Sequence, residues 1–176
     1  MSANVGNWFI LMRHAKSDWS GGVTDDHLRP LAERGTRDAC RMGQWLNQSG
    51  YLPRSIMSST AFRTQQTVKL LGAGLGCDTE SITSWHKALY HSSKSTIREA
   101  LRLGHGPCGV MLVGHNPGLE EFLQWVLAPG QLDNARRKIF PTAAIYVLAA
   151  EMDVSVLSRG CARILAHQRP KLLDNQ

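Results

Sequence analysis

The feature of this sequence that most constrains its fold is a regular alternation between short apolar runs and longer amphipathic segments. We predict the apolar runs as strands and the amphipathic segments, which carry apolar residues on one face, as helices. This alternation is typical of an α/β domain. We therefore predict a three-layer α/β/α sandwich whose sheet is mostly parallel with an antiparallel edge strand. The predicted strands cover 8–12, 55–58, 81–84, 110–113, 143–149 and 161–166, and the predicted helices cover 33–48, 60–71, 92–103 and 117–127.

Length and composition indicate one globular domain. A chain of 176 residues with 43% hydrophobic content suffices to bury a core. We expect residues 1–176 to form a single catalytic domain, with 168–176 as a frayed tail. No stretch approaches the roughly 18 apolar residues of a membrane span, and the first residues lack the basic leader of a signal peptide, so we expect a cytoplasmic protein without membrane contact. We also expect a monomer, because nothing indicates a coiled coil.

Basic and nucleophilic side chains follow three of the predicted strands. Arg13 and His14 come directly after the first strand, Arg63 follows the second, and His115 follows the strand at 110–113. In an open α/β sheet, ligands bind beyond the carboxyl ends of the strands. We therefore expect these four side chains to meet at one rim of the sheet.

Two arginines and two histidines, with no acidic residue immediately among them, would repel each other unless an anion held them together. Guanidinium groups match phosphate oxygens in pairs, and an imidazole offers either a nucleophilic nitrogen or a donor proton. Each residue alone also fits a structural or surface role. Their convergence indicates a phosphoryl site.

The order of motifs resembles the histidine phosphatase superfamily, whose fold is shared with the phosphoglycerate mutases. Within it, the chain is most similar to the SixA-type phosphohistidine phosphatases, and the similarity spans residues 8–150. The motifs that carry the resemblance are Arg13-His14-Ala15, Arg29-Pro30-Leu31, Ser59 to Thr67, Leu89-Tyr90, Val113 to Leu119 and Phe140 to Ala144.

The resemblance implies that His14 is the nucleophile and forms a transient phosphohistidine. Arg13 and Arg63 would hold the phosphoryl oxygens, and His115 would donate to them. Because the arginines can offset the charge of a transferring phosphoryl group, we expect no metal ion and no other cofactor. Arg29 would either contact the substrate or fix its loop, and the two alternatives remain open. The residues expected at the substrate are Arg29, Ser59 and Asn116.

The leaving group is harder to predict. Superfamily members that act on sugar phosphates carry a carboxylate that protonates the departing alkoxide, and the candidates here are Asp18, Asp78 and Glu80. None stands out. A phosphorylated imidazole can take its proton from solvent, so this absence favours a phosphoramidate donor. His86 and His91 would line the entrance or be ordinary surface histidines.

We therefore predict a metal-independent phosphatase that acts on a phosphohistidine-bearing protein domain. A phosphatase of small phosphate esters on the same fold remains an alternative. A second alternative is a non-catalytic module that binds an anion or nucleic acid, because the formal net charge is +6. The basic residues are spread along the chain without the aromatic-rich pattern that binds nucleic acid, so we expect no nucleic-acid partner.

Overall fold

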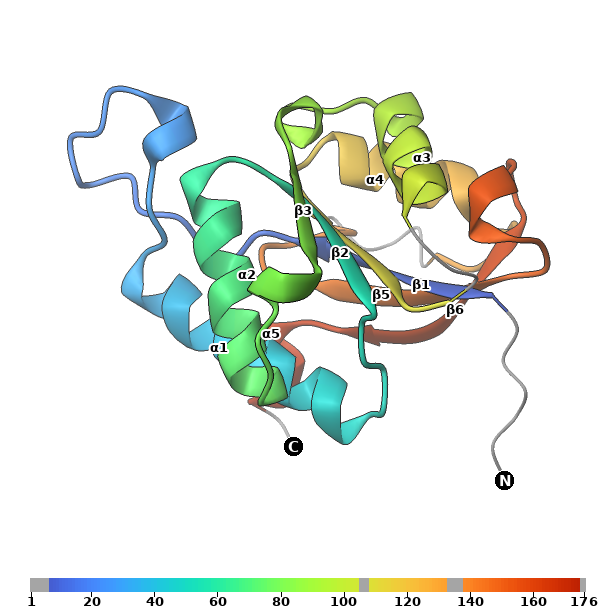
Figure 1. Cartoon of the computed structure of the whole chain (residues 1–176), viewed down its shortest axis with the longest axis horizontal. Helices are drawn as coiled ribbons and strands as arrows, with labels where there is room; N and C mark the ends of the chain where they lie inside the picture. The colour runs from blue at the N-terminus through green and yellow to red at the C-terminus, as the bar shows by residue number, and fades with distance from the viewer. Residues whose placement is uncertain (1–6, 105–107, 133–137, 175–176) are drawn as a thin grey trace.

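The computed structural model describes residues 7–104, 108–132 and 138–174, which form a six-stranded sheet between two layers of helices (Figure 1). The strands are β1 (Trp8–Arg13), β2 (Ser55–Ser59), β3 (Thr83–His86), β4 (Val110–Gly114), β5 (Ile145–Ala150) and β6 (Ala162–Gln168). The helices are α1 (Glu33–Gln48), α2 (Phe62–Leu75), α3 (Lys94–Leu103), α4 (Gly118–Val126) and α5 (Pro170–Leu173). Short 3-10 turns cover Asp26–Leu28, Glu80–Ile82, Lys87–Leu89 and Val154–Val156.

The sheet has the order β3-β2-β4-β1-β5-β6. Strands β3, β2, β4 and β1 pair in parallel, whereas β5 is antiparallel to β1 and β6 is antiparallel to β5. The predicted α/β/α sandwich with an antiparallel edge strand is therefore confirmed. The strand whose direction is reversed is β5, which lies between β1 and the edge strand β6 and is antiparallel to both.

Each face of the sheet has its own core. Along β1, Phe9 and Leu11 point into the cluster that α3 and α4 cover, whereas Ile10 and Met12 point into the cluster that α1 and α2 cover (Figure 1). All four side chains are fully buried. Successive strand residues face opposite sides, so a strand covered on both faces is a continuous apolar run.

Helix α1 packs closely on the loop that follows β1. A Cβ added at Gly35 would lie 2.0 Å from the carbonyl oxygen of Lys16, which a side chain cannot do. Glycine at this position therefore lets the helix contact the chain two residues beyond His14. The loop that carries His14 is held against the body of the domain.

Several element boundaries differ from the predictions. Strand β3 begins at Thr83 rather than at 81, because a 3-10 turn covers Glu80–Ile82. Strand β5 begins at Ile145 rather than at 143, because Ala143 has a φ of 60°. Helix α2 begins only at Phe62 but continues to Leu75, where Gly76 ends it in the left-handed conformation.

Helix α4 begins at Gly118 rather than at 117, and the Asn116 side chain before it donates to the Phe140 carbonyl at 3.1 Å. One further prediction is wrong. The stretch expected to fray contains the end of β6 and helix α5 instead. Among the residues that the structure describes, no helix is long and apolar enough to cross a membrane.

Candidate active site

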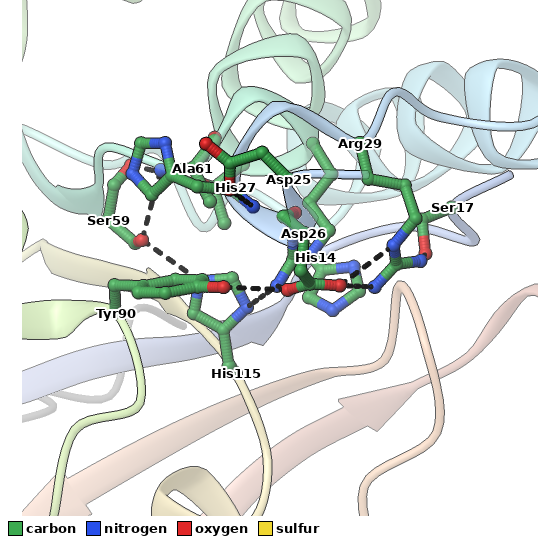
Figure 2. A network of polar contacts seen from close by, with 12 residues as sticks. His14, Ser17, Asp25, Asp26, His27, Arg29, Ser59, Ala61, Tyr90 and His115 are labelled. Carbon is green, nitrogen blue, oxygen red and sulfur yellow. Dashed lines mark hydrogen bonds and ion pairs between the residues drawn. The ribbon is translucent and has the colours of Figure 1, made fainter. Parts of the chain in front are cut away.

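The carboxyl ends of β1, β2 and β4 are neighbours at the centre of the sheet. His14 and His115 lie close together there (Figure 2). The ring centroids of His14 and His115 are 5.0 Å apart. Arg63 donates from Nη2 towards His115 Nδ1 at 3.4 Å. Arg13 ends β1 next to His14, and its Nη1 donates to the Phe140 carbonyl at 2.9 Å. The convergence of the four side chains on one rim, expected from the sequence, is observed.

His14 is held as a neutral imidazole in one tautomer. Its Nδ1 lies 2.7 Å from the carbonyl oxygen of Ala15, which only accepts, so Nδ1 carries the proton and Nε2 keeps its lone pair. Burial, followed by the charges of Arg63, Arg13 and Arg29, lowers the pKa of His14 to about 3. Burial is the larger cause of the lowered pKa, and the neighbouring cations add to it.

Backbone hydrogen bonds fix the position of His14. Its amide donates to the Gly114 carbonyl at 3.0 Å, and its carbonyl accepts from the amide of Ala143 at 3.1 Å. The next amide, of Ala15, donates to Thr67 Oγ1 at 3.1 Å. The nucleophile is thereby tied to β4, to the chain before β5 and to α2.

His115 has both ring nitrogens engaged. A guanidinium only donates, so Nδ1 accepts from Arg63, and Nε2 carries the proton that it donates to Ser59 Oγ at 2.9 Å. Burial, followed by the charges of its neighbours, lowers the pKa of His115 to about 2. Ser59 is fully buried and hydrogen-bonded to the His115 ring, so it supports His115 rather than facing a substrate.

A carboxylate that was not among the predicted site residues, that of Asp26, joins the arginines. Asp26 accepts from Arg63 Nη2 at 3.0 Å through Oδ2, and from Arg29 Nε and Nη2 at 2.9 and 2.7 Å through Oδ1 (Figure 2). Its backbone carbonyl also accepts from Arg63 Nη1 at 2.6 Å. The expectation that no acidic residue lies among the cations is therefore wrong.

Tyr90 completes this network by donating from its hydroxyl to Asp26 Oδ2 at 2.7 Å. Burial works to raise the pKa of Asp26, but the hydrogen bonds from Tyr90 and Arg29, together with the charge on Arg63, hold it well below its usual range. Burial and the hydrogen bond to Asp26 raise the pKa of Tyr90. Asp26 is therefore a carboxylate and Tyr90 a neutral phenol at neutral pH.

Arg29 makes loop contacts. Besides Asp26, its Nη1 bonds to Ser17 Oγ, and the Trp19 ring lies 3.7 Å from its guanidinium carbon. These contacts match the loop-fixing alternative, while its charge still acts on His14.

None of the residues considered as a general acid suits that role in the structure, two because of their position and Asp18 because its carboxyl group is ionised. Asp78 and Glu80 precede β3, at the amino end of the parallel strands and opposite to the site. Asp18 accepts from the Ser20 amide and hydroxyl at 2.8 and 2.7 Å, which lowers its pKa. His91 does lie at the site, with its ring centroid 6.5 Å from that of His115.

The sequence carried a weak signal for Asp26. It stands three residues before Arg29, in the segment that ends with Arg29-Pro30-Leu31, and that spacing suits a local ion pair. Nothing in the spacing indicates that Arg63, 37 residues away, would share the same carboxylate. Within the described part of the chain, no group of His, Cys, Asp and Glu could hold a metal ion.

The site combines a neutral imidazole that has a free nitrogen with guanidinium groups at the end of a parallel sheet. This arrangement is typical of proteins that transfer phosphoryl groups through a histidine. Residues 9–87 match the family model of the histidine phosphatase superfamily (branch 1). A protein of Mycobacterium tuberculosis named as uncharacterized is 32% identical over 165 residues, which are 91% of this chain and 100% of the relative. A chloroplastic protein of Arabidopsis thaliana, also named as uncharacterized, is 32% identical over 68% of this chain and 59% of its own length.

Solved structures agree with this assignment. A crystal structure from Agrobacterium tumefaciens, provisionally described as the phosphohistidine phosphatase SixA, superposes with a TM-score of 0.77 and 27% identity, over 93% of this chain and 98% of that chain. A solved structure from Nakamurella multipartita, provisionally described in the same way, gives a TM-score of 0.74 and 27% identity over 94% of this chain and 96% of that chain. The chain therefore belongs to the histidine phosphatase superfamily, in its SixA-type branch, and is a phosphatase.

Proposed function

We propose that this phosphatase hydrolyses phosphohistidine on proteins through a covalent phosphoryl intermediate on His14. The observation that carries the proposal is the hydrogen bond from His14 Nδ1 to the Ala15 carbonyl, since it leaves a lone pair on Nε2 of a neutral ring. An imidazole must be unprotonated to attack phosphorus, and a lowered pKa keeps it so.

The reaction has two steps. In the first, the Nε2 lone pair of His14 forms a bond to phosphorus while the phosphorus–nitrogen bond of the donor breaks, and the donor imidazole leaves with a proton. In the second, water attacks the phosphoryl group on His14 and releases inorganic phosphate and a neutral His14. Arg13 and Arg63 would balance the charge on the phosphoryl oxygens in both steps, where electrostatics and positioning supply most of the catalysis.

Ser59 would let His115 change roles during the cycle. Its Oγ already accepts from the Ala61 amide at 3.2 Å, so its own proton is free to point at His115 Nε2. In that arrangement Nδ1 carries the ring proton and donates to a phosphoryl oxygen. The change needs no rotation of the ring, only a tautomer in which Ser59 donates instead of accepts.

The groups around the site favour a phosphoramidate over an alkyl phosphate. An alkoxide leaves slowly unless a strong acid protonates it, and two carboxyl groups near the site, Asp18 and Asp26, both have lowered pKa values. An imidazole leaves as a neutral ring after taking up one proton from a much weaker acid.

The rim of the site favours a donor carried on a protein. Large apolar side chains are exposed on the elements that surround it: Trp19 in the loop after β1, Leu28 in the turn that contains Asp26, and Phe62 directly before Arg63. Trp85 on β3 adds to them, and with Phe62 it lines an open groove beside α2. Exposed aromatic side chains of this kind are common where proteins contact one another.

A substrate panel tests the proposal. The purified protein would be incubated with a phosphorylated histidine-containing domain and, separately, with a set of sugar phosphates, and phosphate release would be measured. The proposal predicts that kcat/KM for the phosphorylated domain exceeds the values for the sugar phosphates by orders of magnitude. Turnover of the sugar phosphates alone would refute it and support the small-ester alternative.

A further inference from the structure

The first step of the proposed reaction needs a proton for the departing group, and most groups at the site do not supply one. Burial holds His14 and His115 neutral, with pKa values of about 3 and about 2. Asp18 and Asp26 have lowered pKa values and are ionised at neutral pH. The hydroxyl proton of Tyr90 is already donated to Asp26, at 2.7 Å.

His91 lies beside these groups and remains exposed. Its ring centroid is 4.1 Å from that of Tyr90 and 6.5 Å from that of His115, with an angle of 30° between the two imidazole planes. The charge of His91 also contributes to the lowered pKa of His115, so the two rings interact electrostatically. Histidine is the side chain that most readily exchanges a proton near neutral pH.

The backbone holds His91 in an uncommon conformation. Its φ of 53° lies in the left-handed region, which residues other than glycine rarely adopt and which occurs preferentially at functional sites. The next residue, Ser92, packs against α4: a Cβ added at Gly118 would lie 2.0 Å from the Ser92 carbonyl oxygen. Since α4 follows His115, this close contact fixes the His91 loop next to the His115 loop.

We propose that His91 is the proton donor to the leaving group, an inference that rests on the proposed function for the identity of that group. The imidazolium of His91 transfers its N–H proton to the ring nitrogen of the substrate histidine that does not carry phosphorus. The electron pair of the phosphorus–nitrogen bond then remains on the departing ring, which leaves neutral as His14 Nε2 bonds to phosphorus. His91 becomes a neutral imidazole and regains its proton from solvent, which it reaches because it is exposed.

The proton donor and the leaving group are then both imidazole rings, so the proton passes between two groups of the same chemical kind. A strong carboxylic acid is not needed, which agrees with the lowered pKa values of Asp18 and Asp26. The charged and titratable groups around His91 are His115 on the β4 side and, across Tyr90, Asp26, Arg63 and His27.

The test compares two donors that differ in their need for a proton. Phosphoimidazole needs one to release its ring, whereas p-nitrophenyl phosphate releases a stable anion. We expect His91→Asn to lower kcat for phosphoimidazole about 10²-fold and to leave kcat for p-nitrophenyl phosphate within about twofold. Asparagine suits the position because it tolerates a positive φ.

Two further measurements separate catalysis from structure. Added imidazole should restore part of the activity of His91→Asn towards phosphoimidazole, and the loss of wild-type kcat at alkaline pH should disappear in the variant. The matched control is His27→Asn, which removes another imidazole that packs on Tyr90 but whose Nε2 is hydrogen-bonded with Thr60 Oγ1 at 3.0 Å. We expect the ratio of kcat for phosphoimidazole to kcat for p-nitrophenyl phosphate in His27→Asn to equal the wild-type ratio.

Equal losses for the two donors, or no loss for either, would overturn the proposal. Its outcome is separate from that of the proposed function. If the wild-type protein hydrolyses phosphate esters but no phosphohistidine, the same variant still decides the matter, because esters with basic leaving groups should then lose activity while p-nitrophenyl phosphate does not.

Discussion

Removal of the negative charge of Asp26 should strengthen the binding of phosphate. The Asp26 carboxylate occupies guanidinium hydrogens of Arg63 and Arg29 that a phosphoryl group would also attract. In Asp26→Asn the amide oxygen can still accept from Arg29, so the loop keeps one of its contacts. The variant therefore removes charge with little change in shape.

The magnitude follows from the distances. Asp26 Oδ2 is 3.0 Å from Arg63 Nη2, and a phosphate bound to that guanidinium lies roughly 6 Å from the carboxylate. Charges of −1 and −2 at that distance repel by about 1 to 3 kcal/mol for an effective dielectric constant between about 80 and 40. Salt screening reduces this to about 1 to 2 kcal/mol, so phosphate should bind about 5- to 30-fold more tightly.

The assay is competitive inhibition by inorganic phosphate at moderate ionic strength, with p-nitrophenyl phosphate as the reporter substrate. The matched control is Asp25→Asn, which removes the same charge one residue earlier, where the carboxylate accepts from the His27 amide at 2.9 Å rather than from an arginine. Weaker or unchanged phosphate inhibition in Asp26→Asn would refute the reasoning. It would show that the carboxylate assembles the cations more than it competes with the phosphate.

Three other outcomes are expected. Folding lowers the pKa values of His14 and His115 from about 6.5 in the unfolded chain to about 3 and about 2. Below about pH 6.5 the unfolded state therefore binds more protons than the folded state, and the folded state loses stability as the pH falls. The free energy of unfolding in urea should drop by about 2 to 3 kcal/mol between pH 7.5 and 5.5, and a double variant with asparagine at both positions that kept the full drop would contradict this. Ser59→Ala should lower kcat about tenfold through the lost hydrogen bond to His115, and unchanged kcat would show that the serine does not orient the ring. Gly35→Ala should cost about 1 to 3 kcal/mol of stability, because its Cβ meets the Lys16 carbonyl at 2.0 Å, and wild-type thermal unfolding would contradict that packing.

The sequence predicts the layers of the fold well because both faces of the sheet are covered. A strand buried on two sides is a continuous apolar run, as along β1, and α1 matches its prediction at both ends, Glu33 and Gln48. The boundaries that differ are set by local backbone geometry. The turn Glu80–Ile82 and the positive φ of Ala143 leave no mark in the periodicity of apolar residues.

The same distinction holds at the site. Arg13, His14 and His115 directly follow strand residues, so the rule that parallel strands share a carboxyl edge was enough to bring them together. Asp26 and His91 come from irregular segments whose paths depend on tertiary contacts. The sequence alone could not predict that Asp26 lies beside Arg63 or that His91 lies beside Tyr90.

The measurement that tests the central claim most directly is capture of the phosphoryl intermediate. The protein would be mixed with a phosphorylated histidine-containing domain carrying labelled phosphate, quenched in alkali within milliseconds, and analysed for phosphorylated peptides. We predict acid-labile, alkali-stable label on the peptide that contains His14, attached at Nε2, and no label on a His14→Asn variant. Phosphate release without label on His14, or label retained in the variant, would contradict the mechanism.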